Sequence, residues 1–406
     1  TDAVNQAFLY PDYENTTSMA YGEYTFGGDY NLTGYFEALY QDSEYNQRGQ
    51  AAQLFPWVPA NNPYNICNPN GVRGVDCGNA EDIFMFTNPG YAAAFEAAQG
   101  VPPTFYAGFL ANGNIGPMPV QPVVAVQGDR TASTVTFQNA RLVGGLKGDL
   151  PGLNTGTLSN WGFDAYITYS RSKGTSNRYG IRGDRLDYAL GNYSSTGTPC
   201  DNDYGVSMAD DVAAGCVAVD MFAPSLWDNG VGDFATQAER DYLFDARDFD
   251  TVYEQTVVSG SMTGDIYQME GGPVLLGLGF EYRKDEINSM PDAIARDGLF
   301  FGYFSDGGAV GDRSSKEAFF ELEAPLLSGK PIAKELSLNV SARLTDDELY
   351  GSNTTESVKI GWRPVNSLLV RATYGTAFRA PNLRELYLLN QTGFNSIFDP
   401  CVTPSE

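Results

Sequence analysis

Apolar and polar residues alternate strictly near the C-terminal end of the printed sequence. From Leu336 to Leu344 every second residue is apolar, and polar residues fill the gaps. The alternation returns over residues 358–363 and again over 368–379, after a short break each time. Successive side chains of a strand point to opposite faces, so a period of two predicts strands with one apolar and one polar face. Three consecutive antiparallel strands are therefore expected here.

The same alternation predicts strands elsewhere in the chain. The expected ranges are 18–26, 30–41, 133–147, 161–170, 251–263, 274–287 and 316–326, which brings the total to about ten. The apolar phase slips between Phe137 and Leu142, which predicts a β-bulge near Asn139. The predicted fold class is all-β and antiparallel.

The connections between these strands fall into two sets. Short turns near Gly28, Gly152, Gly271, Gly329 and Asn366 alternate with long segments at about 42–132, 171–248 and 288–314 and a shorter acidic one at 345–353. Short turns on one side and long loops on the other are typical of a transmembrane β-barrel with extracellular loops. Alternation alone fits equally well a sandwich that packs its apolar faces together.

Composition supports a membrane barrel. The chain has 406 residues with 45 Gly, 25 Tyr and 24 Phe, and only 18% of its residues are charged. Many strands with aromatic ends and Gly-rich turns would give this mixture. No apolar run reaches the roughly 20 residues that a membrane helix needs, so a span would have to consist of strands.

The net charge and the absence of histidine argue against several classes of function. A net charge of −25 argues against a nucleic-acid partner, because phosphates would be repelled. The sequence contains no His, which removes the commonest general base and a frequent metal ligand. We therefore expect no enzyme, no catalytic residue, no metal site and no cofactor.

Four of the five cysteines bracket two polar loops. Cys67 with Cys77, and Cys200 with Cys216, lie outside the predicted strands and lack the spacing of a metal knuckle. Two loop-closing disulfides in an oxidising compartment are expected, and free thiols are the alternative. Cys401 remains, and its partner is expected in sequence beyond the residues given.

The run AFRAPNLRELY at 377–387 is similar to the barrel signature of TonB-dependent outer-membrane receptors. Segments that resemble the same family precede it in the family's order, at 57–78, 141–153, 272–286, 316–327 and 336–375. The resemblance implies a structural role for the signature residues Phe378, Arg379, Pro381, Asn382 and Leu383.

The resemblance also implies an outer-membrane location in a Gram-negative bacterium, in contact with lipid. The whole range 1–406 would be one partial barrel domain, the first half of a plugged barrel of about 22 strands. The plug and the remaining strands of the family have no counterpart in this chain. The implied function is uptake of a scarce siderophore-iron, cobalamin or oligosaccharide ligand, driven by TonB through the plug.

Aromatic residues of the long loops are the candidate ligand contacts. Aromatic rings there could stack on a sugar, a catecholate or a macrocycle, or they could pack the loops together at the membrane interface. The candidates are Trp57, Tyr64, Trp227, Phe301, Tyr303 and Phe304.

Charged residues on the polar faces suggest a ladder of cross-strand pairs. Its members are Glu317, Glu321, Glu323, Arg343, Lys359, Arg363 and Arg371. The ladder is expected to stabilise a polar lumen wall, with substrate binding as the alternative. The run from Asp201 to Gly205 lacks the distal Glu of a calcium loop, so calcium is not expected.

Two other functions fit parts of the pattern. A passive porin-like channel would share the alternation of apolar and polar residues. A secreted all-β carbohydrate-active protein could use paired carboxylates such as Asp346 and Asp347. Adjacent strand residues point to opposite faces, however, so these two could not flank one bond.

Overall fold

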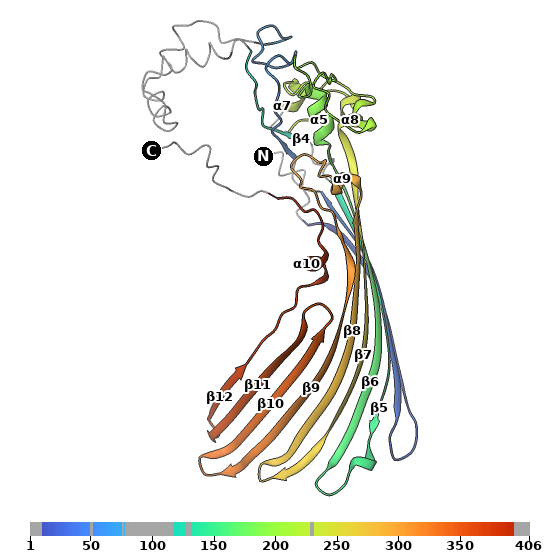
Figure 1. Cartoon of the computed structure of the whole chain (residues 1–406), viewed down its shortest axis with the longest axis vertical. Helices are drawn as coiled ribbons and strands as arrows, with labels where there is room; N and C mark the ends of the chain where they lie inside the picture. Colours follow the sequence, from blue (N-terminus) through green and yellow to red (C-terminus); the bar gives the residue numbers. More distant parts are fainter. Residues whose placement is uncertain are drawn as a thin grey trace, which may run out of the picture.

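One curved antiparallel sheet forms most of the molecule, as the computed structural model shows (Figure 1). The structure describes residues 10–48, 52–74, 77, 117–126, 132–227 and 231–393. Within them the sheet has ten strands in the order β1-β2-β5-β6-β7-β8-β9-β10-β11-β12. Each strand therefore pairs with the sheet strands that precede and follow it in the chain. The predicted all-β antiparallel barrel wall is confirmed, and the sheet is open in this structure.

The strands are long compared with the predicted segments. They are β1 (Asp12–Thr25), β2 (Thr33–Arg48), β5 (Ala132–Asp149), β6 (Ser159–Ile181), β7 (Phe244–Met269), β8 (Gly272–Pro291), β9 (Ala309–Lys330), β10 (Ala333–Asp347), β11 (Gly351–Val365) and β12 (Leu368–Gly375). A separate two-stranded sheet pairs β3 (Ala52–Leu54) with β4 (Val124–Val126). A 3-10 turn, η2 (Pro151–Leu153), joins β5 to β6.

The described helices are short, and most lie at the end of the sheet where the long connections meet (Figure 1). They are α5 (Gly183–Leu190), α6 (Asp210–Ala213), α7 (Pro224–Trp227), α8 (Gln237–Leu243), α9 (Ala293–Arg296) and α10 (Leu383–Tyr387). Among the residues that the structure describes, no helix has the length and apolarity needed to cross a membrane.

The outer face of the sheet carries an apolar belt. Register places Leu338 beside Ile360, and Ile360 beside Ala372, so alternate residues of neighbouring strands share this face. The belt continues across the sheet through Phe320, Leu278, Met262, Phe163 and Leu146. Ile360 is 46% exposed and no second sheet covers it among the described residues. The belt therefore faces outward, as a lipid-facing surface requires.

Aromatic rings on both faces lie across glycines of the neighbouring strand. A Cβ on Gly260 would meet the Phe280 ring, one on Gly264 would meet Trp161, and one on Gly145 would meet Tyr35. Such pairs cover the gap that a glycine leaves in a strand and help to fix the register. Trp161, the first residue of the predicted strand 161–170, is only 7% exposed because it lies flat in this way.

The predicted bulge near Asn139 is wrong. The pairing of β5 with β2 and with β6 continues through Asn139 without a shift. Leu142 faces outward within the belt, whereas Phe137 lies on the opposite face, farther along the same strand. The apolar phase changes because the strand leaves the belt and not because a residue is inserted.

The loops are also shorter than the predicted segments 42–132, 171–248 and 288–314. Strand β6 runs ten residues past Arg171 to Ile181, and β8 and β9 reach Pro291 and Ala309. Outside the belt both faces of a strand meet water, so polar residues occupy both and the alternation disappears. Sequence periodicity therefore marked only the part of each strand that carries the belt.

The long connections fold into a small domain with its own core. It is here called the cap and comprises the described residues of 52–126 and of 182–243. Strands β3 and β4 pack against α5, α7 and α8 around apolar side chains that are almost fully buried. These are Leu54, Val58, Val124, Val126, Leu186, Leu190, Val219, Met221, Leu226, Phe234 and Leu243. No periodic pattern marks this core in the sequence, since its members come from short and widely separated segments.

Both predicted disulfides are present in the cap. Cys67 is bonded to Cys77, and Cys200 to Cys216. Each closes a loop, which restricts the unfolded chain and stabilises a domain with a small core. Cys401 lies outside the described residues.

A buried arginine ties the cap to the sheet. The Arg182 side chain is 3% exposed and forms ion pairs with Asp184 at 2.7 Å, Asp211 at 3.1 Å and Asp245 at 3.2 Å. Arg185 contacts Asp211 at 2.8 Å as well. These carboxylates come from α5, α6 and β7, so the cluster joins three elements. A buried guanidinium requires such partners, because an unpaired one would be strongly destabilising.

The acid response of the cap should depend on Asp211. Its hydrogen bond from Arg185 lowers the carboxyl pKa below the ordinary value. A lowered pKa stabilises the fold above the unfolded pKa of about 4, and this contribution is lost as pH falls through the folded pKa. The protein is held at pH 7 or given a pulse at pH 3, and both samples are then digested briefly with trypsin at pH 7. Faster cleavage of the cap after the pulse would show that acid opens it. In the Asp211→Asn variant the cap should be less stable than in the wild type at pH 7, and its cleavage should change less after the acid pulse. An acid response equal to that of the wild type would contradict this role of Asp211.

The orientation of the belt can be tested on two adjacent residues of β10. Leu338→Lys places a charge in the lipid-facing belt and should destabilise the barrel by about 2–4 kcal/mol. Asn339→Lys places the same charge on the opposite face, where Asn339 donates to Glu321 at 2.7 Å, and should be tolerated. Heat-modifiable migration of the native protein on gels reports folding. Equal loss of the folded band in both variants would contradict the assignment of faces.

Candidate functional site

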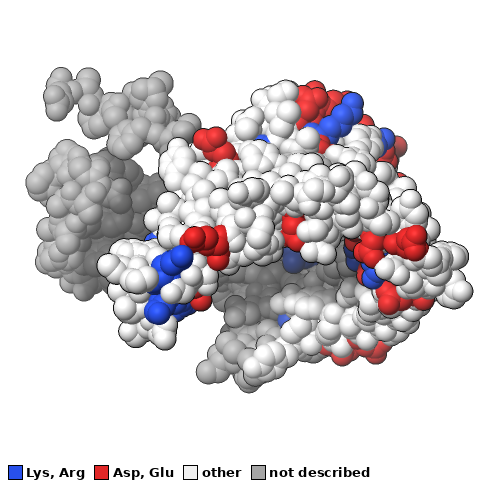
Figure 2. Space-filling view, turned by 90° about the horizontal axis from the view of Figure 1, so that it is seen from below, with Lys and Arg blue, Asp and Glu red and all other residues white. Residues whose placement is uncertain are grey.

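The inner face of the sheet, on which α10 lies, is polar and rich in charge. The Tyr387 ring of α10 packs on Gly311 of β9, and Gly311 lies on the face opposite the apolar belt. Helix α10 therefore lies against the inner face. Seen from below, charged side chains gather in separate patches around a hollow and most of the visible surface is uncharged (Figure 2). The inner face would line the lumen of a closed barrel, since the belt occupies the other face.

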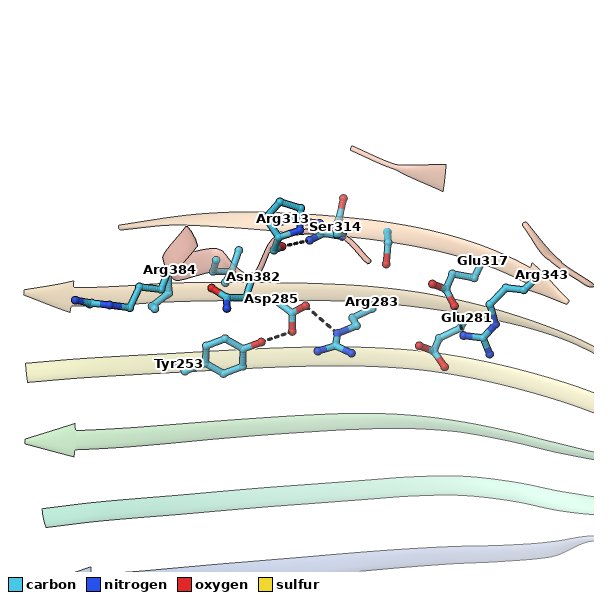
Figure 3. A pocket seen from close by; sticks show the side chains of 15 residues that line it. Tyr253, Glu281, Arg283, Asp285, Arg313, Ser314, Glu317, Arg343, Asn382 and Arg384 are labelled. Carbon is cyan, nitrogen blue, oxygen red and sulfur yellow. Dashed lines mark hydrogen bonds and ion pairs between the residues drawn. The ribbon is translucent and has the colours of Figure 1, made fainter. Parts of the chain in front are cut away.

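A cavity of about 560 Å³ opens between the inner face of β7–β10 and the segment that follows β12. Figure 3 shows its side chains projecting from neighbouring strands toward one space. The lining residues include Tyr253, Glu281, Arg283, Asp285, Arg313, Glu317, Arg343, Asn382 and Arg384. Four arginines and three carboxylates thus meet a chamber large enough for part of a small-molecule ligand.

One carboxylate organises the centre of the cavity wall. Asp285 accepts hydrogen bonds from the Tyr253 hydroxyl at 2.7 Å, the Arg283 Nε at 2.8 Å and the Gln255 amide at 2.9 Å. Three donors on two strands hold the carboxylate in place, and they leave the terminal nitrogens of Arg283 facing the cavity (Figure 3). None of these residues was among the candidates predicted from the sequence, although each lies on the polar face of a predicted strand.

The predicted charge ladder is partly present. Arg343 donates to Glu317 at 2.6 Å and lies 4.9 Å from the Phe319 ring centre, and Arg363 donates to Glu335 at 2.8 Å. Glu321 accepts from Asn339 instead of from a basic residue. Within the part of the chain that the structure describes, Glu323, Lys359 and Arg371 form no ion pair, although all three line a second open pocket.

Arg313 connects the cavity to the signature segment. Its Nε donates to Asp347 at 2.6 Å and its Nη1 donates to the Pro381 carbonyl at 2.7 Å. The Asp347 side chain is fully buried and also accepts from the backbone N–H groups of Leu349 and Tyr350. One arginine therefore joins β9, the end of β10 and the FRAPN run.

The remaining signature residues shape α10. Asn382 caps the helix by accepting from the Glu385 N–H, and Glu385 reaches back to the Asn382 N–H. Arg379 donates to both oxygens of Glu385, at 2.7 and 2.8 Å, which lowers the pKa of this carboxyl. Leu383 is 5% exposed. The structure thus gives Arg379, Pro381, Asn382 and Leu383 structural contacts, while Phe378 is 37% exposed.

The six candidate loop aromatics occupy different surroundings. Trp57 and Trp227 are 58% and 48% exposed, and the Trp227 indole donates to the Met221 carbonyl. Phe301 packs on Phe55 at the edge of the cap core. Tyr64 is half-buried, and Tyr303 and Phe304 lie in the connection between β8 and β9. Ligand contact by any of the six stays a prediction.

Acidic residues singled out in the sequence do not form a chemical centre. Asp346 lies beside Lys316 on the outer face and Asp347 beside Ser315 on the inner face, as their adjacency predicted. Asp203 accepts from the Ser195 N–H at 2.6 Å, and Asp201 accepts from Ser194. Among the described residues no cluster of acidic or sulfur side chains could hold a metal ion.

A model of the family described as TonB dependent receptor-like, beta-barrel, matches residues 120–400. Vitamin B12 transporter BtuB from three strains of Vibrio cholerae serotype O1 is 36% identical to this chain over 76 residues. That match covers 19% of this chain and 11% of each transporter, so the chain matches only a small part of these curated relatives.

Among solved structures, the translocator domain of autotransporter NalP from Neisseria meningitidis aligns with 89% of this chain and 81% of its own length. The sequence identity is 9% and the TM-score is 0.23. Superposition at that level supports no conclusion about this chain.

The connection through Arg313 can be measured by substitution. Arg313→Met would leave the buried Asp347 carboxylate without its cation, which typically costs about 3–5 kcal/mol. Amide hydrogen exchange over residues 380–389 should accelerate in this variant of the native protein.

Two controls accompany this measurement. Arg363→Met breaks a solvent-exposed pair and should cost about 0–1 kcal/mol. The double change Arg313→Met with Asp347→Asn removes the unpaired charge and should recover part of the protection. Unchanged exchange in Arg313→Met would show that Arg313 does not hold the signature segment.

Proposed function

The chain belongs to the TonB-dependent receptor-like β-barrel family, and from this membership we propose that it takes up a scarce extracellular ligand by transport coupled to TonB. Proteins of this family are outer-membrane proteins of Gram-negative bacteria, and this chain is one of them. The proposed partners are outer-membrane lipid around the belt, TonB reached through a plug, and a small-molecule or oligosaccharide ligand inside.

One observation supports uptake above the others. A continuous apolar belt follows the outer face of the sheet, and the polar inner face carries a cavity lined by fixed charges. A wall of this kind separates an aqueous path from lipid. Hydrogen bonds fix side chains such as Asp285 and Arg283 in the wall. Their geometry is set before a ligand arrives, which favours selective binding.

The ligand classes proposed are siderophore-bound iron, cobalamin and oligosaccharides. Because the matched relatives are named vitamin B12 transporters, corrinoids are the first ligands to test. The exposed rings of Trp57 and Trp227 in the cap are proposed to meet the ligand first, since flat aromatic surfaces bind both sugars and macrocycles.

Uptake should require TonB. In a host that lacks its own receptors, cells expressing the native protein should accumulate one of three labelled probes: cyanocobalamin, a ferric siderophore or a maltooligosaccharide. Accumulation should fall to the background level when TonB is deleted. Accumulation that is unchanged by this deletion would favour the passive porin-like channel and contradict coupled transport.

The cap aromatics provide a second readout in the same assay. Trp57→Ala or Trp227→Ala should lower apparent affinity about tenfold, equivalent to about 1.4 kcal/mol of lost stacking. Tyr350→Ala removes an equally exposed ring in the turn between β10 and β11 and serves as the matched control. Equal effects of the three changes would argue against a ligand role for the two tryptophans.

A further inference from the structure

Two arginines face each other on the inner wall just below the cap. Arg178 of β6 and Arg247 of β7 are directly opposite in the register, so their side chains leave the same face of neighbouring strands. Their guanidinium carbons lie 5.3 and 5.1 Å from the centre of the Tyr303 ring. Arg178 also donates to the Tyr303 hydroxyl at 2.8 Å. Two like charges are therefore held against one aromatic ring.

Neither of these arginines has a carboxylate partner within 4.0 Å among the described residues. Five other arginines of the inner wall do have one: Arg141 with Glu37, Arg283 with Asp285, Arg313 with Asp347, Arg343 with Glu317 and Arg363 with Glu335. Arg371 also lacks one, but it lies on β12 at the edge of the described sheet. The chain has 50 acidic and 25 basic residues, so carboxylates are not scarce. The missing partner at this pair is a property of the position.

The acidic residues that act on Arg247 from a distance are already engaged. Asp292 accepts from the N–H groups of Asp248 and Ala295, and Asp306 accepts from Arg384 and from the Gly308 N–H. The Tyr303 ring attracts each cation by about 0.5–2 kcal/mol, while the two cations repel each other. A group with negative charge placed between them would relieve this repulsion.

We propose that Arg178, Arg247 and Tyr303 form a binding site for an oxyanion group, a phosphate or a carboxylate, of the transported ligand. Guanidinium groups present parallel N–H donors that match the spacing of oxyanion oxygens. The Tyr303 ring holds both side chains and orders them before binding. This inference rests on the proposed function only in assigning the oxyanion to the transported ligand.

The position of the pair suits capture of an entering ligand. Arg247 is the fourth residue of β7, near the point where the strand leaves the cap. Two residues farther along the same face, the Phe249 ring lies 5.7 Å from the guanidinium of Arg384, and Arg384 also lines the 560 Å³ cavity. A ligand passing under the cap would meet the arginine pair before this cavity.

Anion binding by the purified native protein in detergent tests the site. Inorganic phosphate and acetate are titrated separately by calorimetry, in chloride of constant concentration. Saturable binding of phosphate, acetate or both is expected, and the anion that binds identifies the oxyanion class. Arg178→Gln and Arg247→Gln should each weaken binding at least tenfold. Absence of saturable binding of both anions would overturn the proposal.

Matched variants separate binding from folding. Arg296→Gln changes an exposed arginine of α9, in the same connection as Tyr303, that pairs only with its neighbour Asp297 among the described residues, and it should bind within twofold of the wild type. Heat-modifiable gel migration confirms that each variant is folded. Wild-type affinity in folded Arg178→Gln and Arg247→Gln would overturn the site.

Uptake distinguishes failure of this site from failure of the proposed function. Phosphate binding that depends on Arg247, in a protein whose uptake is independent of TonB, would support the site and reject coupled transport. TonB-dependent uptake at the wild-type level in Arg247→Gln would support transport and overturn the assignment of the oxyanion to the ligand.

Discussion

A chain that crosses lipid must satisfy every backbone N–H and C=O group within the protein, and the rest of this structure follows from that requirement. The ten described strands of the large sheet satisfy one another in simple sequence order, so each strand between β1 and β12 hydrogen-bonds to the sheet strands on either side of it. Once the backbone is satisfied, the two sets of side chains can meet different surroundings. Apolar residues such as Ile360 face outward, and charged residues such as Arg343 face the wet interior.

Sequence periodicity identified the sheet because the belt imposes a period of two. The strands near Leu338 and Ile360 were predicted with their faces correct, and the cysteine pairs were correct because each brackets one polar loop. The upper part of each strand was missed. Between Arg171 and Ile181 water lies on both sides of β6, so no alternation marks the residues as a strand.

The cap core and the residues that line the cavity could not be predicted from the sequence for a different reason. The cap core joins Leu54, Leu226 and Phe234 from distant segments, and none of these segments is long enough to show a period. The cavity depends on which inner residues stand opposite each other. The pairing of Arg178 with Arg247 follows from strand register, and sequence positions alone do not fix that register across a connection as long as the one between β6 and β7.

The longest strands extend beyond the membrane, so one part of them is surrounded by lipid and another by water. Strand β7 has 26 residues, which corresponds to about 85 Å of chain and roughly 65 Å along the membrane normal at a tilt of about 40°. An apolar band is only about 25 Å tall. More than half of β7 therefore stands in water and is held by ordinary aqueous forces. Denaturants can melt this outer half while the lipid-embedded half persists, so unfolding is not a single two-state transition.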